Sequence, residues 1–155
     1  MNHEHINDPL SDIFLEIFNE MKSISEQRDV YSKKISNHSV ISFSVKKEDK
    51  KVLAMAYYQY ASLLVASVSR METLLSKLPN IIVEADKRND REQIVLCDEL
   101  LTRYGEFKKS ISTFAEQNER LFSKDHILSS EMLTPLSEFN YKLSYFESYL
   151  KEHQN

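Results

Sequence analysis

The sequence contains very few residues that end helices or form sharp turns. It has one glycine, Gly105, and three prolines in 155 residues. Glycine and proline are the residues that most often mark turns and loops between elements. A chain this poor in both has few breaks, so we expect a small number of long helices and not many short strands. The single glycine also excludes glycine-rich loops that cradle phosphate groups.

Cysteine is equally scarce, and it limits the compartment and the kinds of site. Cys97 is the only cysteine, so the chain forms no internal disulfide and no thiolate cluster for zinc. The first residues show no basic segment followed by an apolar one, which is the pattern of a signal peptide. We therefore expect a cytoplasmic protein. The net charge of −4 gives no general attraction to nucleic acids or anionic membranes.

Charge is absent from one long stretch, the 18 residues from Val52 to Ser69. Two neighbouring apolar rows run along it at helical spacing. One row contains Leu53, Tyr57, Tyr60 and Leu64, and the other contains Ala54, Tyr58, Ala61 and Val65. A helix with two apolar rows needs neighbours on more than one side, so we expect it at the centre of the fold, covered by the other helices. The stretch approaches the lower length limit of a transmembrane helix. Its tyrosine, glutamine and serine side chains favour a soluble helix, so we expect no membrane partner.

Apolar residues also repeat at spacings of three and four in three further segments, which is typical of helices that pack side by side. These segments run from about Pro9 to Ile35, Arg91 to Phe122 and Thr134 to Leu150. Together with the uncharged helix, which ends at Leu78, they predict an all-α fold. The arrangement that we expect is an antiparallel up-and-down bundle of three long helices and one shorter C-terminal helix.

The bundle is expected to form a single domain over residues 1–155, with two parts outside its helices. Residues 1–7 are polar and are expected to be a flexible N-terminus. Residues 36–46 contain Ile41, Phe43 and Val45 in alternation with serine, a strand-like pattern. Because no second strand is available to pair with it, we expect an extended connection between the first two helices.

Three polar residues occupy positions in the apolar repeats: Arg28, Ser67 and Asn118. A buried polar residue between packed helices can fix their register at a cost in stability. We predict that these three form a buried polar seam. Arg28 would need an acceptor and could lie near Tyr60, whereas Ser67 would bond to its own helix.

The predicted C-terminal helix is only about half as long as its neighbours. It would therefore leave an apolar groove at one end of the bundle, and soluble proteins seldom leave such a surface bare. We predict a protein–protein interaction module (an adaptor, regulator, chaperone or inhibitor) that acts as a homodimer or binds a protein in this groove. Tyrosine is a frequent interface anchor. The candidate partner-binding residues are Tyr57, Tyr58, Tyr141, Tyr145 and Tyr149.

No pattern of catalytic or cofactor-binding residues stands out, so we expect neither an enzyme nor a bound cofactor, metal or small-molecule substrate. One alternative comes from Arg120 and His126, whose spacing is similar to the Arg-x4–6-His motif of HEPN-type ribonucleases. This resemblance covers seven residues and implies a small ribonuclease in which His126 is the acid or base and Arg120 holds the phosphate. A nucleic-acid-associated regulator that stacks bases on the tyrosines of the last helix is a further alternative.

Overall fold

The computed structural model of the protein describes residues 8–37, 47–123 and 128–153. These residues form five helices: α2 (Pro9–Asn37), α3 (Lys47–Leu75), α4 (Leu78–Lys87), α5 (Arg91–Phe122) and α6 (Leu128–Glu152). No strand occurs in the described part of the chain. The predicted all-α class is therefore confirmed.

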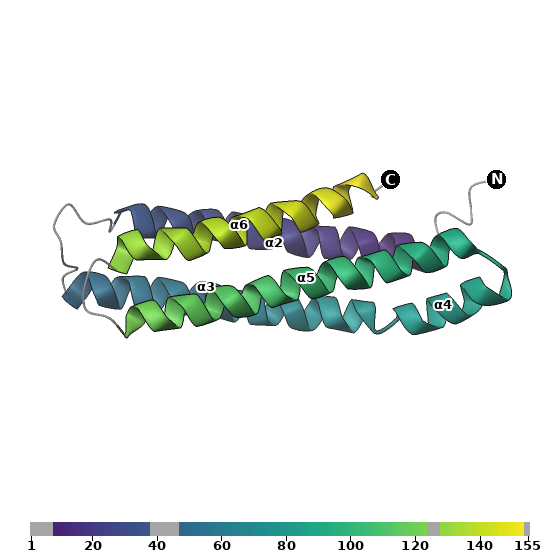
Figure 1. Ribbon diagram of the computed structural model, residues 1–155, viewed down its shortest axis with the longest axis horizontal. Helices are drawn as coiled ribbons and strands as arrows, with labels where there is room; N and C mark the ends of the chain where they lie inside the picture. Colours follow the sequence, from purple (N-terminus) through teal and green to yellow (C-terminus); the bar gives the residue numbers. More distant parts are fainter. Residues whose placement is uncertain (1–7, 38–46, 124–127, 154–155) are drawn as a thin grey trace.

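The four long helices lie side by side, and α4 continues the course of α3 (Figure 1). The helix α2 packs against α3 and α6, and α5 packs against α6, α4 and α3. Helices α3 and α6 consequently occupy opposite corners of the bundle. Each long helix runs in the direction opposite to the one before it (Figure 1). This arrangement decides which sides of α3 are covered and which are open.

Aspartate side chains cap the N-termini of α2 and α5, as their positions in the sequence predict. The Asp8 carboxylate accepts hydrogen bonds from the Leu10 backbone N–H at 3.0 Å and the Ser11 hydroxyl at 3.1 Å. The Asp90 carboxylate accepts from the Gln93 N–H at 3.2 Å at the start of α5. The first N–H groups of a helix have no partner inside it, so these side chains satisfy donors that would otherwise be lost.

The central helix is shorter than expected and is followed by a separate helix. It ends at Leu75 and not at Leu78, and α4 then begins at Leu78, with Pro79 in its first turn. Proline fits the first turn because its missing N–H would have no partner there. Leu75 and Leu78 are both buried, so the chain keeps its apolar contacts across the break.

The last helix begins earlier than predicted, at Leu128 and not near Thr134. Thr134 and Pro135 resemble a helix start, but Pro135 lies inside α6. Met132 and Leu136, on either side of this pair, are fully buried. Burial of these side chains outweighs the hydrogen bond that a proline inside a helix removes. At 25 residues, α6 is only slightly shorter than α3, so the expected large uncovered groove at one end is wrong.

Aromatic rings fill the middle of the bundle. Phe114 on α5 has its ring centroid 4.8 Å from that of Phe139 on α6 and 6.2 Å from that of Tyr31 on α2. The ring of Tyr60 on α3 lies 6.1 Å from Phe114 and stacks on Tyr31 at 5.3 Å. Residues from all four long helices therefore meet at Phe114, which is buried.

Two predictions about segments between the helices fall mainly outside the described residues. The flexible N-terminus, residues 1–7, lies there entirely. Of the expected extended connection at 36–46, Ser36 and Asn37 belong to the last turn of α2, which is a correction. Residues 38–46 lie outside the described part of the chain.

Candidate interaction surface

The outward side of α3 is apolar and carries no charged residue over five helical turns. Its exposed residues are Val52, Met55, Tyr58, Gln59, Ser62, Val65, Ala66 and Ser69, and we call them the α3 face. Met55 is 64% exposed, Tyr58 52% and Val65 69%. A continuous row of large apolar side chains with this much exposed surface usually marks an interaction site.

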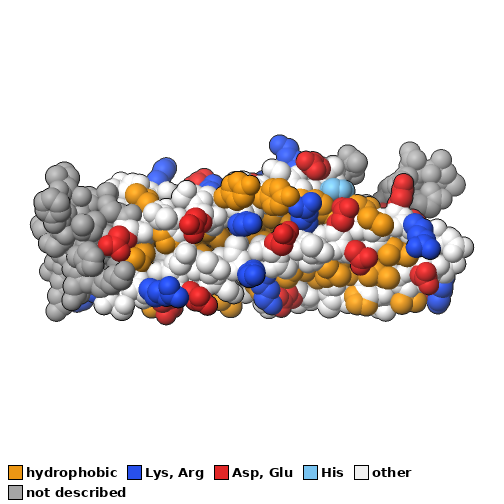
Figure 2. All heavy atoms as spheres, viewed as in Figure 1, with side chains coloured by type: hydrophobic (Ala, Val, Ile, Leu, Met, Phe, Trp, Pro, Cys, Tyr) orange, Lys and Arg blue, Asp and Glu red, His pale blue; other side chains and the backbone are white. Residues whose placement is uncertain are grey.

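The neighbouring helix α5 does not share this composition. The exposed residues of α5 include ten charged ones: Arg91, Glu92, Asp98, Glu99, Glu106, Lys108, Lys109, Glu116, Glu119 and Arg120. Figure 2 shows the side of the molecule on which α5 and α6 lie, where basic and acidic side chains are scattered among apolar ones. Water-facing helix positions are usually polar or charged. The α3 face departs from this rule within the same protein.

The uncharged helix packs against α2 and α5, as the expectation of neighbours on more than one side requires, but its outward side is exposed. Of the two predicted apolar rows, the one through Leu53, Tyr57 and Leu64 is buried, whereas Tyr58 and Val65 of the other row face outward. Because α6 lies at the diagonal corner, nothing covers the fourth side of α3 among the described residues. By length and composition alone, the helical segment Asp49–Lys87 is apolar enough to cross a membrane, and 33% of its most apolar part is buried.

Tyr58 is held in place by contacts with the neighbouring helix. Its ring stacks on that of Phe122 of α5, with 6.2 Å between centroids, and packs edge-on against Tyr57 at 5.0 Å. The Tyr57 hydroxyl in turn donates to the Ala115 carbonyl of α5 at 3.3 Å. Burial raises the pKa of Tyr57 to about 12. An exposed ring held on two sides is ordered before any partner arrives, which lowers the entropy cost of binding.

Polar contacts between helices lie just past the C-terminal end of the α3 face, after Ser69. Towards α2, the Arg70 guanidinium donates to the two carboxylate oxygens of Glu20 at 2.6 and 3.0 Å. Towards α5, Glu72 pairs with Lys108 at 2.5 Å and accepts from the Tyr104 hydroxyl at 2.9 Å. These pairs fix the end of α3 against its neighbours, and along the face the Lys34 ammonium of α2 donates to the Gln59 side chain at 3.5 Å.

The pair of Glu20 and Arg70 predicts how stability changes with pH. The hydrogen bond from Arg70 is the main reason that the pKa of Glu20 lies below its ordinary value of 4.5. The pair therefore stabilises the fold above pH 4.5, and this contribution is lost as the pH falls through the lowered pKa. We expect Glu20→Gln to cost about 1 kcal/mol at neutral pH and to make the loss of stability in acid shallower.

Urea unfolding at a series of pH values measures this effect. Glu26→Gln on the same helix is the control, because Glu26 is exposed and makes no ion pair with any described residue. The role assigned to Glu20 is wrong if the two variants have the same pH profile.

The five predicted partner-binding tyrosines separate into two groups. Tyr57 and Tyr149 are buried in the core, so they present no surface to a partner, which corrects the prediction for these two. Tyr58, Tyr141 and Tyr145 are exposed. They do not line one groove, because the helices α3 and α6 that carry them lie at opposite corners. On α6, Tyr145 accepts a hydrogen bond from Arg103 of α5, whose guanidinium lies 5.0 Å from the ring centroid.

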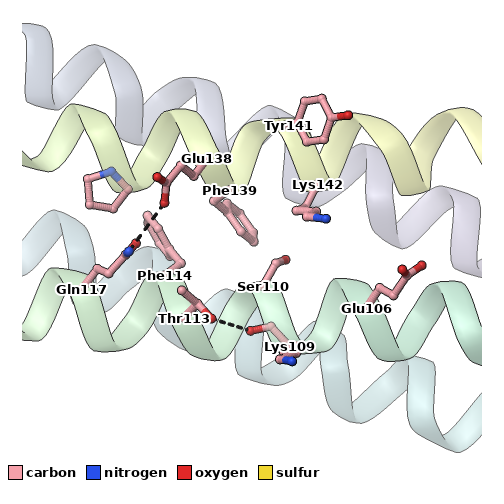
Figure 3. A pocket seen from close by; sticks show the side chains of 11 residues that line it. Glu106, Lys109, Ser110, Thr113, Phe114, Gln117, Glu138, Phe139, Tyr141 and Lys142 are labelled. Carbon is pink, nitrogen blue, oxygen red and sulfur yellow. Dashed lines mark hydrogen bonds between the residues drawn. The ribbon is translucent and has the colours of Figure 1, made fainter.

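A different groove runs between α5 and α6, with a volume of about 590 Å³ (Figure 3). Phe114, Phe139 and Pro135 supply its apolar lining. Its polar lining residues are Glu106, Lys109, Ser110, Thr113, Gln117, Glu138, Tyr141 and Lys142. Gln117 donates to Glu138 across one end at 3.5 Å. Acidic and basic residues alternate along its edges, so the groove selects no ligand charge, in contrast to the uniform α3 face.

The predicted polar seam is present at two of its three positions. Asn118 is fully buried, accepts from the Tyr31 hydroxyl at 3.1 Å and donates to the Phe114 carbonyl at 2.9 Å. Ser67 is also fully buried and accepts at 3.2 Å from Arg70, one turn along its own helix.

Arg28 is not buried, which corrects the third position. Its guanidinium is partly exposed and pairs with the neighbouring Asp29 at 2.8 Å. A long arginine side chain can keep its charge in water while its stem covers apolar surface. The guanidinium is nevertheless close enough to Tyr60 for its charge to oppose the raised pKa of that residue, which is caused mainly by burial.

The residues of the alternative catalytic predictions are only partly described. Arg120 is exposed in the last turn of α5, and His126 lies outside the described residues. The Cys97 thiol is buried, and burial raises its pKa to about 11. Within residues 8–37, 47–123 and 128–153, no three His, Cys, Asp or Glu side chains are grouped to hold a metal ion.

Comparison with protein-family models, with curated proteins and with solved structures finds no match to this chain.

Proposed function

We propose that the protein is a non-catalytic protein–protein interaction module that binds through the α3 face. The observation that carries this proposal is the exposed, uncharged row on α3 beside α5, whose exposed positions include ten charged residues. Removing such a row from water is favourable by about 25 cal/mol for each Å² of apolar surface. A partner that covers it supplies a neighbour for the side of α3 that no described residue covers.

The proposed unit is the antiparallel up-and-down bundle of the long helices α2, α3 and α5 and the slightly shorter C-terminal helix α6, acting in the cytoplasm. The packing of α2 on α3 and α6, and of α5 on α6, supports this arrangement. A rigid bundle presents the α3 face with little rearrangement, as an adaptor, regulator, chaperone or inhibitor requires. An uncharged face offers no partner for phosphates, so the proposed ligand is a protein and not a nucleic acid.

A photo-crosslinking amino acid placed at Val65 tests the proposal in the cells from which the sequence comes. The matched control is the same substitution at Val95, which is 51% exposed but lies on α5 among charged residues. We expect a crosslinked protein product from position 65 and none from position 95. The proposal is wrong if position 65 gives no protein adduct, or if both positions give the same products.

A further inference from the structure

We infer that the partner on the α3 face is a second copy of this chain, packed antiparallel about a two-fold axis near Ser62. This inference rests on the proposed function, because it names the partner of that same surface. It follows from the charge, the side-chain sizes and the order of the residues along α3.

The absence of charge restricts what the face can cover. A partner that brought a charged group onto this surface would lose the hydration of that group and find no opposite charge in return. The best partner is therefore another uncharged helix face. Every copy of this chain carries one, and in a two-fold dimer each face covers the other.

Side-chain size changes along the face and sets the direction of pairing. The first half carries Val52, Met55, Tyr58 and Gln59, and the second half carries the small residues Ser62, Ala66 and Ser69 together with Val65. In a parallel pair, large side chains would meet large ones and small would meet small. An antiparallel pair places Met55 and Tyr58 against small side chains, and among the face residues only Gln59 and Val65 meet as two larger ones, so the helices keep a nearly constant separation along their length.

The position of Ser62 makes it the centre of such a pair. Tyr58 and Ala66 lie four residues before and after it, and Met55 and Ser69 lie seven residues before and after it. A two-fold axis at Ser62 therefore places Tyr58 against the partner's Ala66 and Met55 against the partner's Ser69. Ser62 itself meets the partner's Ser62.

Charges at the two ends of the face support the same direction. Lys51 is exposed just before the face, and Glu72 just after it. Antiparallel packing brings Lys51 of one copy near the partner's Glu72, and a dimer contains this pair twice. Parallel packing would instead place Lys51 beside the partner's Lys51, and like charges repel.

The contact would run about 27 Å along the helix, from the rise of 1.5 Å per residue. One helix pair of this length is at the small end of stable interfaces, which bury about 800 Å² on each partner. The dimer is therefore expected to dissociate on dilution, and the experiments need protein at micromolar concentrations or above.

Disulfide crosslinking of the full chain tests both the partner and the direction. Single cysteines are placed at Ser62, Met55 and Ser69, with Ser112→Cys as an exposed control on α5. Cys97 is buried and stays in place, and the unmodified protein is oxidised in parallel. We expect Ser62→Cys to form a covalent dimer at least about tenfold faster than Ser112→Cys, because the axis holds its two copies together.

Mixed samples then separate antiparallel from parallel pairing. Met55→Cys mixed with Ser69→Cys is expected to crosslink between the two variants, whereas Met55→Cys alone is expected to crosslink slowly. Efficient crosslinking of Met55→Cys and of Ser69→Cys each with itself overturns the antiparallel arrangement. Failure of Ser62→Cys to exceed the Ser112→Cys control also overturns it.

Sedimentation equilibrium gives the dissociation constant of the dimer without any crosslink. Val65→Lys places a charge on the α3 face and is expected to raise this constant by about tenfold or more. Val95→Lys is the matched control and is expected to leave it unchanged, because Val95 lies on α5. A monomer at all concentrations, or equal effects of the two variants, overturns the inference.

The crosslinking experiment under Proposed function distinguishes failure of this inference from failure of the proposed function. An adduct at position 65 with the mass of two copies of the chain agrees with the inference. An adduct with a different protein overturns the inference and keeps the proposed function. An intramolecular product, with the mass of one chain, overturns both the inference and the proposed function. Both are also overturned if no adduct forms and the protein instead floats with phosphatidylcholine vesicles.

Discussion

Replacing Phe114 by alanine is expected to lower the free energy of unfolding by about 4 kcal/mol. The Phe114 ring is in contact range of rings from α2, α3 and α6, with the closest centroid, that of Phe139, at 4.8 Å. Its removal leaves a cavity that none of the four helices can close alone, because each is held by its other contacts. For a chain of this size, the midpoint of thermal unfolding is expected to fall by about 10 °C.

Far-UV circular dichroism during thermal and urea unfolding measures this loss. The protein concentration is kept constant, because self-association would make the apparent stability depend on it. Tyr141→Ala is the control, since Tyr141 is 69% exposed and its loss is expected to change stability by less than about 0.5 kcal/mol. A loss at Phe114 no larger than this control would contradict its place at the centre of the core.

The buried contact between Tyr31 and Asn118 gives the second large effect. Tyr31→Phe removes the hydroxyl that donates to Asn118 and leaves the buried amide oxygen without this donor. An unsatisfied buried polar atom costs about 1–3 kcal/mol. Asn118→Leu also deprives the Tyr31 hydroxyl of its acceptor, so we expect a loss of similar size.

The double variant distinguishes a specific hydrogen bond from a general effect of mutation. The double variant lacks both the Tyr31 hydroxyl and the Asn118 amide, so neither group remains without its partner. We therefore expect it to lose less stability than the sum of the two single losses. Urea unfolding of the four proteins gives this coupling energy. Additive losses would mean that the two groups stabilise the fold independently.

The sequence predicts the class of the fold and the parts of it that depend on local chemistry. The helix starts at Asp8 and Asp90 follow from side chains that accept from backbone N–H groups nearby. The burial of Asn118 follows from its position in an apolar repeat. The start of α6 could not be predicted, because Thr134–Pro135 resembles a helix start and only the burial of Met132 in three dimensions shows otherwise.

The open side of α3 could not be predicted from periodicity either. The neighbouring residues Tyr57 and Tyr58 belong to two apolar rows that differ by about 100° around the helix. Both rows appear equally suited to a core. The first row is buried, whereas Tyr58 and Val65 of the second are exposed, because α6 packs at the diagonal corner and not beside α3. The position of a neighbouring helix therefore decided which tyrosines are available to a partner.

The close contact of Tyr57 with Tyr58 has an optical consequence. The chain contains no tryptophan, so its near-ultraviolet emission comes from its eight tyrosines. The ring centroids of Tyr57 and Tyr58 are 5.0 Å apart, a distance over which excitation energy passes readily between tyrosines. Tyr58 is exposed and Tyr57 is buried. A molecule that covers the α3 face would change the emission of both rings, so the native protein reports on its own surface without an attached dye.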